Sequence, residues 1–388
     1  MIHKLTMSNF RSLGRHVTLT LDRLTVLAGP NGSGKSNVVD ALQFLADCMH
    51  LGLEGAINKR HGIDAVRRWS SGHPFNVGFS IDLNHEQGQA TYSFELAGDR
   101  AMDYRVKRES LEGFTDGQPI RFDIEGAHWK EAPKDLRPKL DPLSLALPLM
   151  AGDERFRPVA DELRAMAVYS IFPDALRQPQ KYDPSKPMER HGANWVSVLK
   201  DQREDSWKPD LVGVLHKLTG DIIDVRPRAV GGYLTVQFEH RAEGSTDDAS
   251  ARSREKRKRF DASQESDGTL RVAGLMTAIL QEPAPSLVAL EEPELTVHPG
   301  VLSLLKDYIE EASHRVQVVL TTHSPDLLDL MDSDAVRVIE KRQGITTVKP
   351  LEDGQRDVVR QGLLTLGEVL RSEGLRQQIE LPLQDAGE

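Results

Sequence analysis

Gly29-Pro30-Asn31-Gly32-Ser33-Gly34-Lys35-Ser36 is the stretch that decides the fold, and it reads G-x-x-x-x-G-K-S. An apolar, β-prone run at 24–28 precedes it, and 37–51 places apolar residues at helical spacing. Between a strand and a helix, this pattern cradles phosphates, because glycines let backbone N–H groups turn inward and the helix N-terminus adds partial positive charge. The alternative is a chance glycine-rich turn, and the flanking strand and helix argue against it. The residues predicted to bind a nucleoside triphosphate are Asn31, Gly32, Ser33, Gly34, Lys35, Ser36 and Asn37.

Two side chains of this phosphate-binding loop carry specific roles. We expect Lys35 to reach the β- and γ-phosphates, where it takes part in catalysis. We expect the Ser36 hydroxyl to be a ligand of Mg²⁺. The predicted cofactors are therefore ATP and Mg²⁺.

Composition describes an ordinary globular chain. Its 388 residues suggest one large unit or two smaller ones, and 39% hydrophobic with 28% charged residues is typical of soluble proteins. The formal charge of −10 argues against a wholly cationic surface, so any nucleic-acid contact must be a local patch.

The single cysteine and the apolar runs indicate the compartment. Cys48 excludes an intrachain disulfide, fits a reducing cytosol and lies on the helix after the loop, where a buried thiol is expected. No signal peptide is evident at the N-terminus, and the apolar run 143–150 is too short to span a bilayer. We therefore expect a cytoplasmic protein without membrane contact.

The chain reads as three segments. Residues 1–129 carry the loop and, from 76 to 124, alternating apolar residues that predict an antiparallel meander. Residues 130–220 are cut by prolines and predict a helical insertion, with one helix over 153–167. Residues 221–388 alternate helix and strand from 268 onward, which indicates a parallel sheet with flanking helices; the predicted fold class is α/β with a mixed central sheet. One helix is predicted there over 357–376.

The second half of the predicted site follows two buried strands. The apolar run 286–290 ends in Glu291 and Glu292, at the edge of the sheet where ligands bind in α/β proteins. Glu291 is placed to hold Mg²⁺, directly or through water, and Glu292 to act as the general base toward the attacking water. The strand 316–321 is followed by His323, which we expect to donate a hydrogen bond to the γ-phosphate. The alternative for the two glutamates is an ordinary acidic turn after a strand, and the alternative for His323 is a purely structural histidine.

A third polar group opens a predicted helix. The segment Ser266-Asp267-Gly268 offers a hydroxyl and free N–H groups, which bind anions. One chain rarely brings two such helix ends to the same triphosphate. We therefore expect this segment to contact the nucleotide bound by a second copy of the chain.

These motifs, together with Asn9-Phe10-Arg11-Ser12, occur in the order of a known family. The chain resembles the ABC-type ATPases of the RecF, OLD and structural-maintenance-of-chromosomes group, also catalogued as AAA-family ATPases, over 1–125 and 220–350. The resemblance implies a P-loop NTPase head of ABC type, interrupted by an insertion, and an ATP-dependent homodimer with ATP between two heads. Ser266 and Gly268 would then face the partner's nucleotide. It also implies that Arg11 and Ser12 lie near the base, ribose or α-phosphate.

Two departures from the family limit what can be carried over. No clear counterpart exists for the glutamine that links Mg²⁺ to the insertion, and the insertion is too short and too rich in proline for a coiled-coil arm. The segment after His323 is short and lacks a convincing acidic cluster for a Toprim nuclease, so we expect an ATPase without nuclease activity.

The sequence leaves the role of ATP hydrolysis open. One hypothesis is a molecular switch, driven by head dimerisation, in DNA repair or in genome and anti-phage defence. DNA would then contact a basic run formed by Arg252, Arg254, Lys256, Arg257, Lys258 and Arg259. A solvated loop is an equal explanation of that run. The alternative is a regulatory ATPase that sequesters or activates a separate toxin or nuclease effector without binding DNA. A non-hydrolysing, ATP-dependent dimeriser is a third.

Overall fold

The computed structural model describes residues 1–100, 102–242 and 257–378. Contacts between residues divide the chain into two compact units. The first unit contains residues 1–164 and the segment from Thr321 onward, and the second unit contains Ala165–Leu320.

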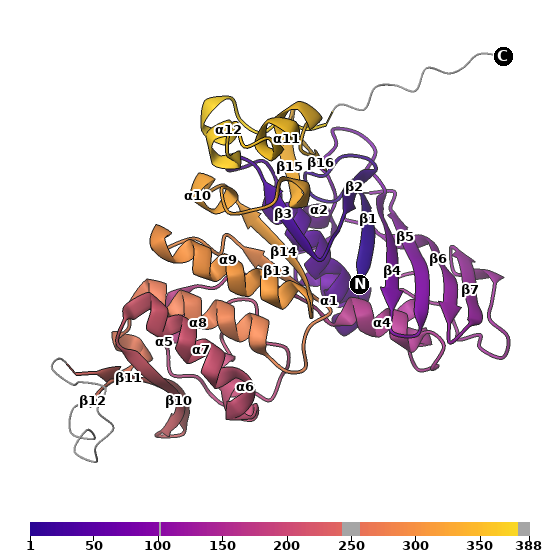
Figure 1. Cartoon of the computed structure of the whole chain (residues 1–388). Helices are drawn as coiled ribbons and strands as arrows, with labels where there is room; N and C mark the ends of the chain where they lie inside the picture. The colour runs from indigo at the N-terminus through magenta and orange to yellow at the C-terminus, as the bar shows by residue number, and fades with distance from the viewer. Residues whose placement is uncertain (101, 243–256, 379–388) are drawn as a thin grey trace. The chain divides into compact units, whose positions relative to one another are not determined.

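The first unit is built on a seven-stranded antiparallel sheet with the order β2-β1-β4-β5-β6-β7-β8. Its strands are β1 (Ile2–Ser8), β2 (Val17–Thr20), β4 (Val77–His85), β5 (Gly88–Ala97), β6 (Arg105–Thr115), β7 (Gln118–Glu125) and β8 (His128–Glu131). Along β4 every second side chain is buried and the residues between are partly or fully exposed, as expected for a sheet with one covered face. The predicted meander is therefore confirmed (Figure 1).

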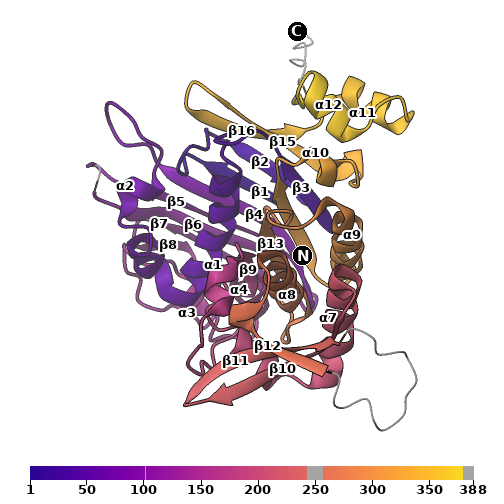
Figure 2. The same ribbon diagram turned by 90° about the vertical axis from the view of Figure 1, so that its left-hand side faces the viewer.

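Helix α1 (Lys35–Asn58) covers the buried face of this sheet (Figure 2). Phe44 of α1 stacks on Phe79 of β4 with 5.6 Å between ring centroids, and Phe10 lies 5.4 Å from both rings. Three short helices complete this part of the unit: α2 (Ile63–Val66), α3 (Leu147–Met150) and α4 (Arg157–Arg164). The buried aromatic cluster fixes α1, and with it the loop that precedes the helix, against the meander.

A second group of strands in the first unit starts from β3 (Leu24–Ala28). This strand pairs in parallel with β15 (Val336–Arg342), which pairs antiparallel with β16 (Ile345–Pro350). The accompanying helices are α10 (Pro325–Leu328), η3 (Ser333–Ala335), α11 (Asp353–Arg360) and α12 (Leu366–Ser372). The single helix predicted over 357–376 is wrong: Gly362 adopts φ +69°, a left-handed conformation that separates α11 from α12.

The second unit contains three strands in the order β14-β13-β9 and a separate antiparallel sheet, β10-β11-β12. These strands are β9 (Met166–Tyr169), β13 (Leu287–Glu291), β14 (Gln317–Thr322), β10 (Ile222–Val230), β11 (Tyr233–Arg241) and β12 (Arg257–Asp261). The last two residues of β14 are counted with the first unit. Its helices are α5 (Pro173–Arg177), α6 (Trp195–Asp201), α7 (Glu204–Thr219), η2 (Ala262–Gln264), α8 (Asp267–Leu280) and α9 (Pro299–Ser313).

Strand β9 corrects the predicted boundary of a helix. The sequence predicted a helix over 153–167, but the helix spans only α4 and is followed by the strand. The reason is tertiary, because all four β9 residues are buried and pair in parallel with β13. The predicted α/β class is confirmed. The structure combines parallel strand pairs with the antiparallel β16 and the antiparallel meander, and helices occur within 130–220. None of the helices in the described part of the chain is long and apolar enough to cross a membrane.

Candidate nucleotide-binding site

The phosphate-binding loop joins β3 to α1 in the first unit. Gly32 and Gly34 adopt φ +78° and +107°, which residues with a Cβ rarely adopt. These conformations wrap the loop around the N-terminus of a 24-residue helix, the arrangement that binds phosphate anions. The Ser33 hydroxyl is buried without a hydrogen-bond partner among the described residues. A cradle of N–H groups with one unsatisfied hydroxyl fits a polyphosphate.

Lys35 lies inside this loop. Its Nζ donates to the carbonyl oxygens of Gly29 at 2.8 Å and Pro30 at 3.2 Å, and the residue is buried. The ammonium is therefore held against the backbone of the loop. Asn31, Gly32 and Ser36 are exposed. The Ser36 hydroxyl is a hard oxygen donor of the kind that Mg²⁺ prefers.

The β15–β16 hairpin braces the loop through Thr346, a residue that the sequence did not single out. Thr346 Oγ1 donates to the Ser33 carbonyl oxygen at 2.9 Å and lies 2.7 Å from Ser12 Oγ. Asn37 Nδ2 donates to the same Ser12 oxygen at 2.6 Å. A Cβ on Gly34 would lie 2.3 Å from Thr346 Oγ1, so the close approach also requires glycine there. Ser12 and Asn37, two predicted site residues, are thus brought together.

Arg11, also predicted near the nucleotide, is oriented by Asp40 of α1. Arg11 Nε donates to Asp40 Oδ2 at 2.6 Å, and Arg60 binds the other carboxylate oxygen at 2.9 Å. Arg60 also binds Asp47 at 2.8 Å. Burial lowers the pKa of Arg60, but hydrogen bonds and ion pairs with both carboxylates raise it overall. No motif marks Asp40 or Arg60, because their relation depends on the fold of α1.

The substitution Asp40→Asn should destabilise the protein. It leaves the buried guanidinium of Arg60 with one carboxylate, and we expect a loss of about 3 kcal/mol in the free energy of unfolding. Chemical denaturation measures this. Lys59→Ala is the control, because Lys59 pairs with Asp47 from a side chain that is 52% exposed, and it should cost less than about 1 kcal/mol. Equal stability of both variants would contradict the assignment.

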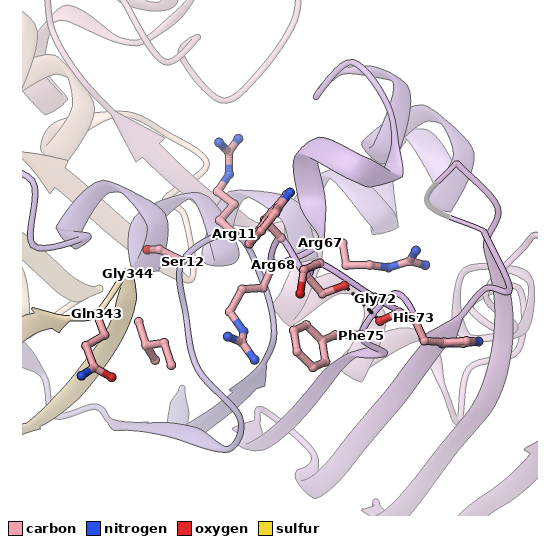
Figure 3. Close-up of a pocket in the computed structure, with 13 residues that line it drawn as sticks. Arg11, Ser12, Arg67, Arg68, Gly72, His73, Phe75, Gln343 and Gly344 are labelled. Carbon is pink, nitrogen blue, oxygen red and sulfur yellow. Dashed lines mark hydrogen bonds between the residues drawn. The ribbon is translucent and has the colours of Figure 1, made fainter.

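A pocket of about 850 Å³ borders these residues within the first unit. Figure 3 shows Ser12 and Arg11 on one side, the tip of the β15–β16 hairpin beside Ser12, and Arg68 next to Phe75. The Arg68 guanidinium lies 4.1 Å from the Phe75 ring centroid. Trp69 also lines the pocket and is 82% exposed. An open pocket with basic and flat aromatic walls, next to the phosphate cradle, can accept the nucleoside part of a nucleotide.

The acidic end of β13, in the second unit, carries Glu291 and Glu292, which are predicted as a Mg²⁺ ligand and as the general base. Glu291 is buried, and Glu292 is half-buried with φ +45°, a left-handed conformation that is strained for a residue with a Cβ. The turn is held by Arg271 of α8, whose Nη2 donates to the Glu292 carbonyl oxygen at 2.8 Å and whose Nη1 donates to the Ile171 carbonyl oxygen at 2.7 Å. Burial lowers the pKa of Arg271.

Glu291, the predicted Mg²⁺ ligand, forms an ion pair with Arg190. The sequence pointed to neither this arginine nor Arg271, because nothing near them in the chain forms a motif. Among the described residues no group of three or more His, Cys, Asp or Glu side chains gathers to hold a metal. Ser36 in the first unit and Glu291 in the second each offer a single oxygen donor of the kind that Mg²⁺ prefers.

The segment Ser266-Asp267-Gly268 begins α8, as predicted. Ser266 Oγ accepts a hydrogen bond from Thr269 N at 3.2 Å, so the hydroxyl caps its own helix. Ser266 and Asp267 are exposed, and Arg177 pairs with Asp267. A Cβ on Gly268 would lie 3.0 Å from the Thr296 carbonyl oxygen, beyond the acidic turn. The start of α8 and the turn after β13 therefore pack together.

A half-buried histidine contacts the residue before this segment. His240 Nε2 is 2.7 Å from Glu265, the residue before Ser266, and Nδ1 is 3.0 Å from Asp221. Burial lowers the pKa of His240, but the two carboxylates raise it above its usual value. The contact with His240 fixes Glu265 and so the entry to α8.

His323 follows β14 and is half-buried at a tight turn in the first unit. Thr322 Oγ1 accepts from Ser324 N at 3.0 Å, and Ser324 caps α10. The first unit, which contains His323, also contains the phosphate-binding loop. Glu291, Glu292 and Ser266-Asp267-Gly268 belong to the second unit.

The predicted basic run is described only in part. Arg252, Arg254 and Lys256 lie outside the described residues. Two of the other three cations, Arg257 and Arg259 of β12, share one carboxylate, that of the buried Glu239, at 3.2 and 2.8 Å, which offsets one of their two charges. Cys48, in contrast, is buried as predicted, and burial raises the pKa of its thiol.

Comparison with known proteins agrees with this architecture. Residues 24–329 match a protein family described as "AAA domain, putative AbiEii toxin, Type IV TA system". A stretch of 45 residues is 47% identical to structural maintenance of chromosomes protein 1 of Caenorhabditis elegans, which is 11% of this chain and only 4% of that protein.

Two solved structures share the fold at 13% identity. One is an Smc head bound to the C-winged helix domain of ScpA, with a TM-score of 0.54 over 89% of this chain and 96% of that chain. The other is an Smc head with an extended coiled coil, bound to the C-terminal domain of ScpA derived from Pyrococcus furiosus, with a TM-score of 0.53 over 93% and 99%. The predicted P-loop head of ABC type is confirmed.

Proposed function

The chain belongs to the AAA-domain family that it matches over residues 24–329, and from this premise we propose that it binds and hydrolyses ATP with Mg²⁺. The observation that carries the proposal is the loop between β3 and α1, with left-handed glycines, an unsatisfied Ser33 hydroxyl and a lysine held against it. In this proposal Lys35 binds the terminal phosphates, and Ser36 and Glu291 bind Mg²⁺. Glu292 orients and deprotonates the attacking water, and His323 donates to the γ-phosphate. Magnesium would neutralise charge on the phosphates.

We propose further that ATP joins two copies of the chain. The exposed start of α8, formed by Ser266, Asp267 and Gly268, offers N–H groups that a single copy does not need for its own phosphate-binding loop. A nucleotide held by the partner would supply the anion. Hydrolysis would then release the two heads, which makes the dimer a switch.

Two biological roles are candidates for this ATP-driven switch. A DNA-associated role in repair or defence relies on the basic run, whereas regulation of a toxin or nuclease effector does not. Glu239 offsets one of the two charges of Arg257 and Arg259, which lowers the net charge of that run and favours the effector. We propose the helices within 130–220 as its docking surface, and no nuclease activity for the chain itself.

Phosphate release from Mg²⁺-ATP by the purified chain tests this proposal. Activity that is unchanged by DNA, together with an effector that co-purifies from native cells, supports regulation. Strong stimulation by DNA supports the DNA-associated role instead. A chain that neither binds nor hydrolyses ATP would contradict both.

The substitution Trp69→Ala should weaken nucleotide binding at the pocket in Figure 3. Loss of one stacking surface for a base costs about 1–3 kcal/mol, so we expect roughly a tenfold increase in Kd for ATP. The Kd for inorganic triphosphate should not change, since it lacks a base. Isothermal titration measures both. Phe114→Ala, which removes an exposed aromatic outside the pocket, is the control. An unchanged Kd for ATP would place the base elsewhere.

A further inference from the structure

The ion pair between Arg190 and Glu291 joins a residue outside every motif to the predicted metal ligand. Both residues lie in the second unit. The Glu291 side chain is 10% exposed and that of Arg190 is 35% exposed, so the pair is partly shielded from water. A carboxylate in this setting attracts a cation more strongly than one at the surface. Arg190 therefore holds the position next to Glu291 that a metal ion would need.

The backbone around Arg190 is fixed on several sides. Its carbonyl oxygen accepts from Ser170 N at 2.9 Å, directly after the β9 residue that pairs with Leu290. Met188 N donates to Gln281 Oε1 at 2.7 Å, and Glu189 N donates to Asn194 Oδ1 at 2.7 Å. The guanidinium is thus delivered to the end of β13 by a well-anchored loop.

Arg271 contacts the same strand end in a different way. It also approaches the end of β13, but it donates to the carbonyl oxygens of Glu292 and Ile171, and no carboxylate is needed for this. Arg190 instead engages the carboxylate itself, and its Nε is buried without a hydrogen-bond partner among the described residues. Arg271 can keep its contacts when a metal binds, whereas Arg190 must share or surrender its own.

We propose that Arg190 is a built-in counter-ion that competes with Mg²⁺ for Glu291. Before nucleotide loading the guanidinium neutralises the carboxylate. Loading of Mg²⁺ with ATP displaces it, so metal binding is coupled to the loop 187–194 that carries Arg190. This inference rests on the proposed function, since it takes Glu291 as a metal ligand. It assigns to Arg190 a positioning role in place of a catalytic one.

The test is the Mg²⁺ concentration that half-saturates binding of a fluorescent, non-hydrolysable ATP analogue. Arg190→Gln removes the competing charge and should lower this concentration about tenfold or more. Arg190→Lys keeps a cation without the same planar geometry and should lower it less. Mn²⁺ bound in the same complex, counted by electron paramagnetic resonance, gives a second readout. Arg203→Gln, at an arginine that is 83% exposed, should leave the value unchanged.

An unchanged or raised half-saturating concentration in Arg190→Gln, with binding of the analogue intact, overturns the inference alone. If Arg190→Gln does not fold, the Arg190→Lys variant decides: a half-saturating Mg²⁺ concentration equal to that of the wild type overturns the inference. In a Glu291→Gln background Arg190→Gln should have no further effect, because the shared carboxylate is gone. A wild-type chain that binds no analogue at any Mg²⁺ concentration overturns the proposed function and this inference with it.

Discussion

Lys35→Ala is expected to raise the Kd for ATP by about 10²–10³-fold. The ammonium would contact two phosphates, and each hydrogen bond to a charged group contributes about 1.5–3 kcal/mol. In the free protein Lys35 donates to the carbonyl oxygens of Gly29 and Pro30, so these groups lose a partner as well. Isothermal titration with Mg²⁺-ATP measures the loss.

Two controls separate the role of this lysine from general damage. Lys59→Ala removes an exposed cation just after the C-terminal end of α1 and should bind ATP as the wild type does. Thermal unfolding should show that Lys35→Ala is folded. ATP binding at wild-type affinity in a folded Lys35→Ala variant would refute the assignment of the phosphate-binding loop.

Glu292→Gln is expected to lower ATP turnover by about 10²–10⁴-fold while leaving ATP binding intact. The amide keeps the shape of the side chain but cannot accept a proton from water, and general base catalysis contributes this range. The backbone contact from Arg271 to the Glu292 carbonyl oxygen does not depend on the carboxylate and should hold the turn in place. The variant should accumulate as an ATP-bound dimer in size-exclusion chromatography.

The same variant tests the shared site. Adding Ser266→Arg, at the exposed start of α8, should return Glu292→Gln to a monomer that still binds ATP. Glu310→Gln, which changes a carboxylate paired with Lys306 on α9, is the matched control and should hydrolyse ATP normally. Persistent turnover in Glu292→Gln would favour a chain that uses ATP without this base. Monomers only, with ATP present, would argue against two heads sharing a nucleotide.

Sequence reasoning was most successful where short-range chemistry dictates structure. Gly32 and Gly34 adopt the left-handed conformations that the motif requires, and Ser266 caps α8 as its residue type predicts. The alternating residues of the meander led to the correct strands because one face of that sheet is buried. Element ends were less predictable. The helix predicted over 153–167 includes residues 166 and 167, although burial beside β13 makes them part of a strand.

The residues that hold the candidate site together could not be read from the sequence. Thr346 braces Ser33 across 313 positions, Asp40 orients Arg11 across 29, and Arg190 reaches Glu291 across 101. No local pattern encodes such pairs, because each depends on which strand ends and turns the fold brings together. Similarly, the sequence does not show that two arginines of the basic run pair with one carboxylate, that of Glu239 on the neighbouring strand.

The sequence by itself determined the nucleotide-binding motif, the acidic strand end and the class of fold, because these depend on backbone conformation and hydrophobic periodicity within a few residues. Only the tertiary structure decided which charges face one another around those motifs. Electrostatic pairing acts through space, and its strength depends on distances and burial that exist only after the chain has folded.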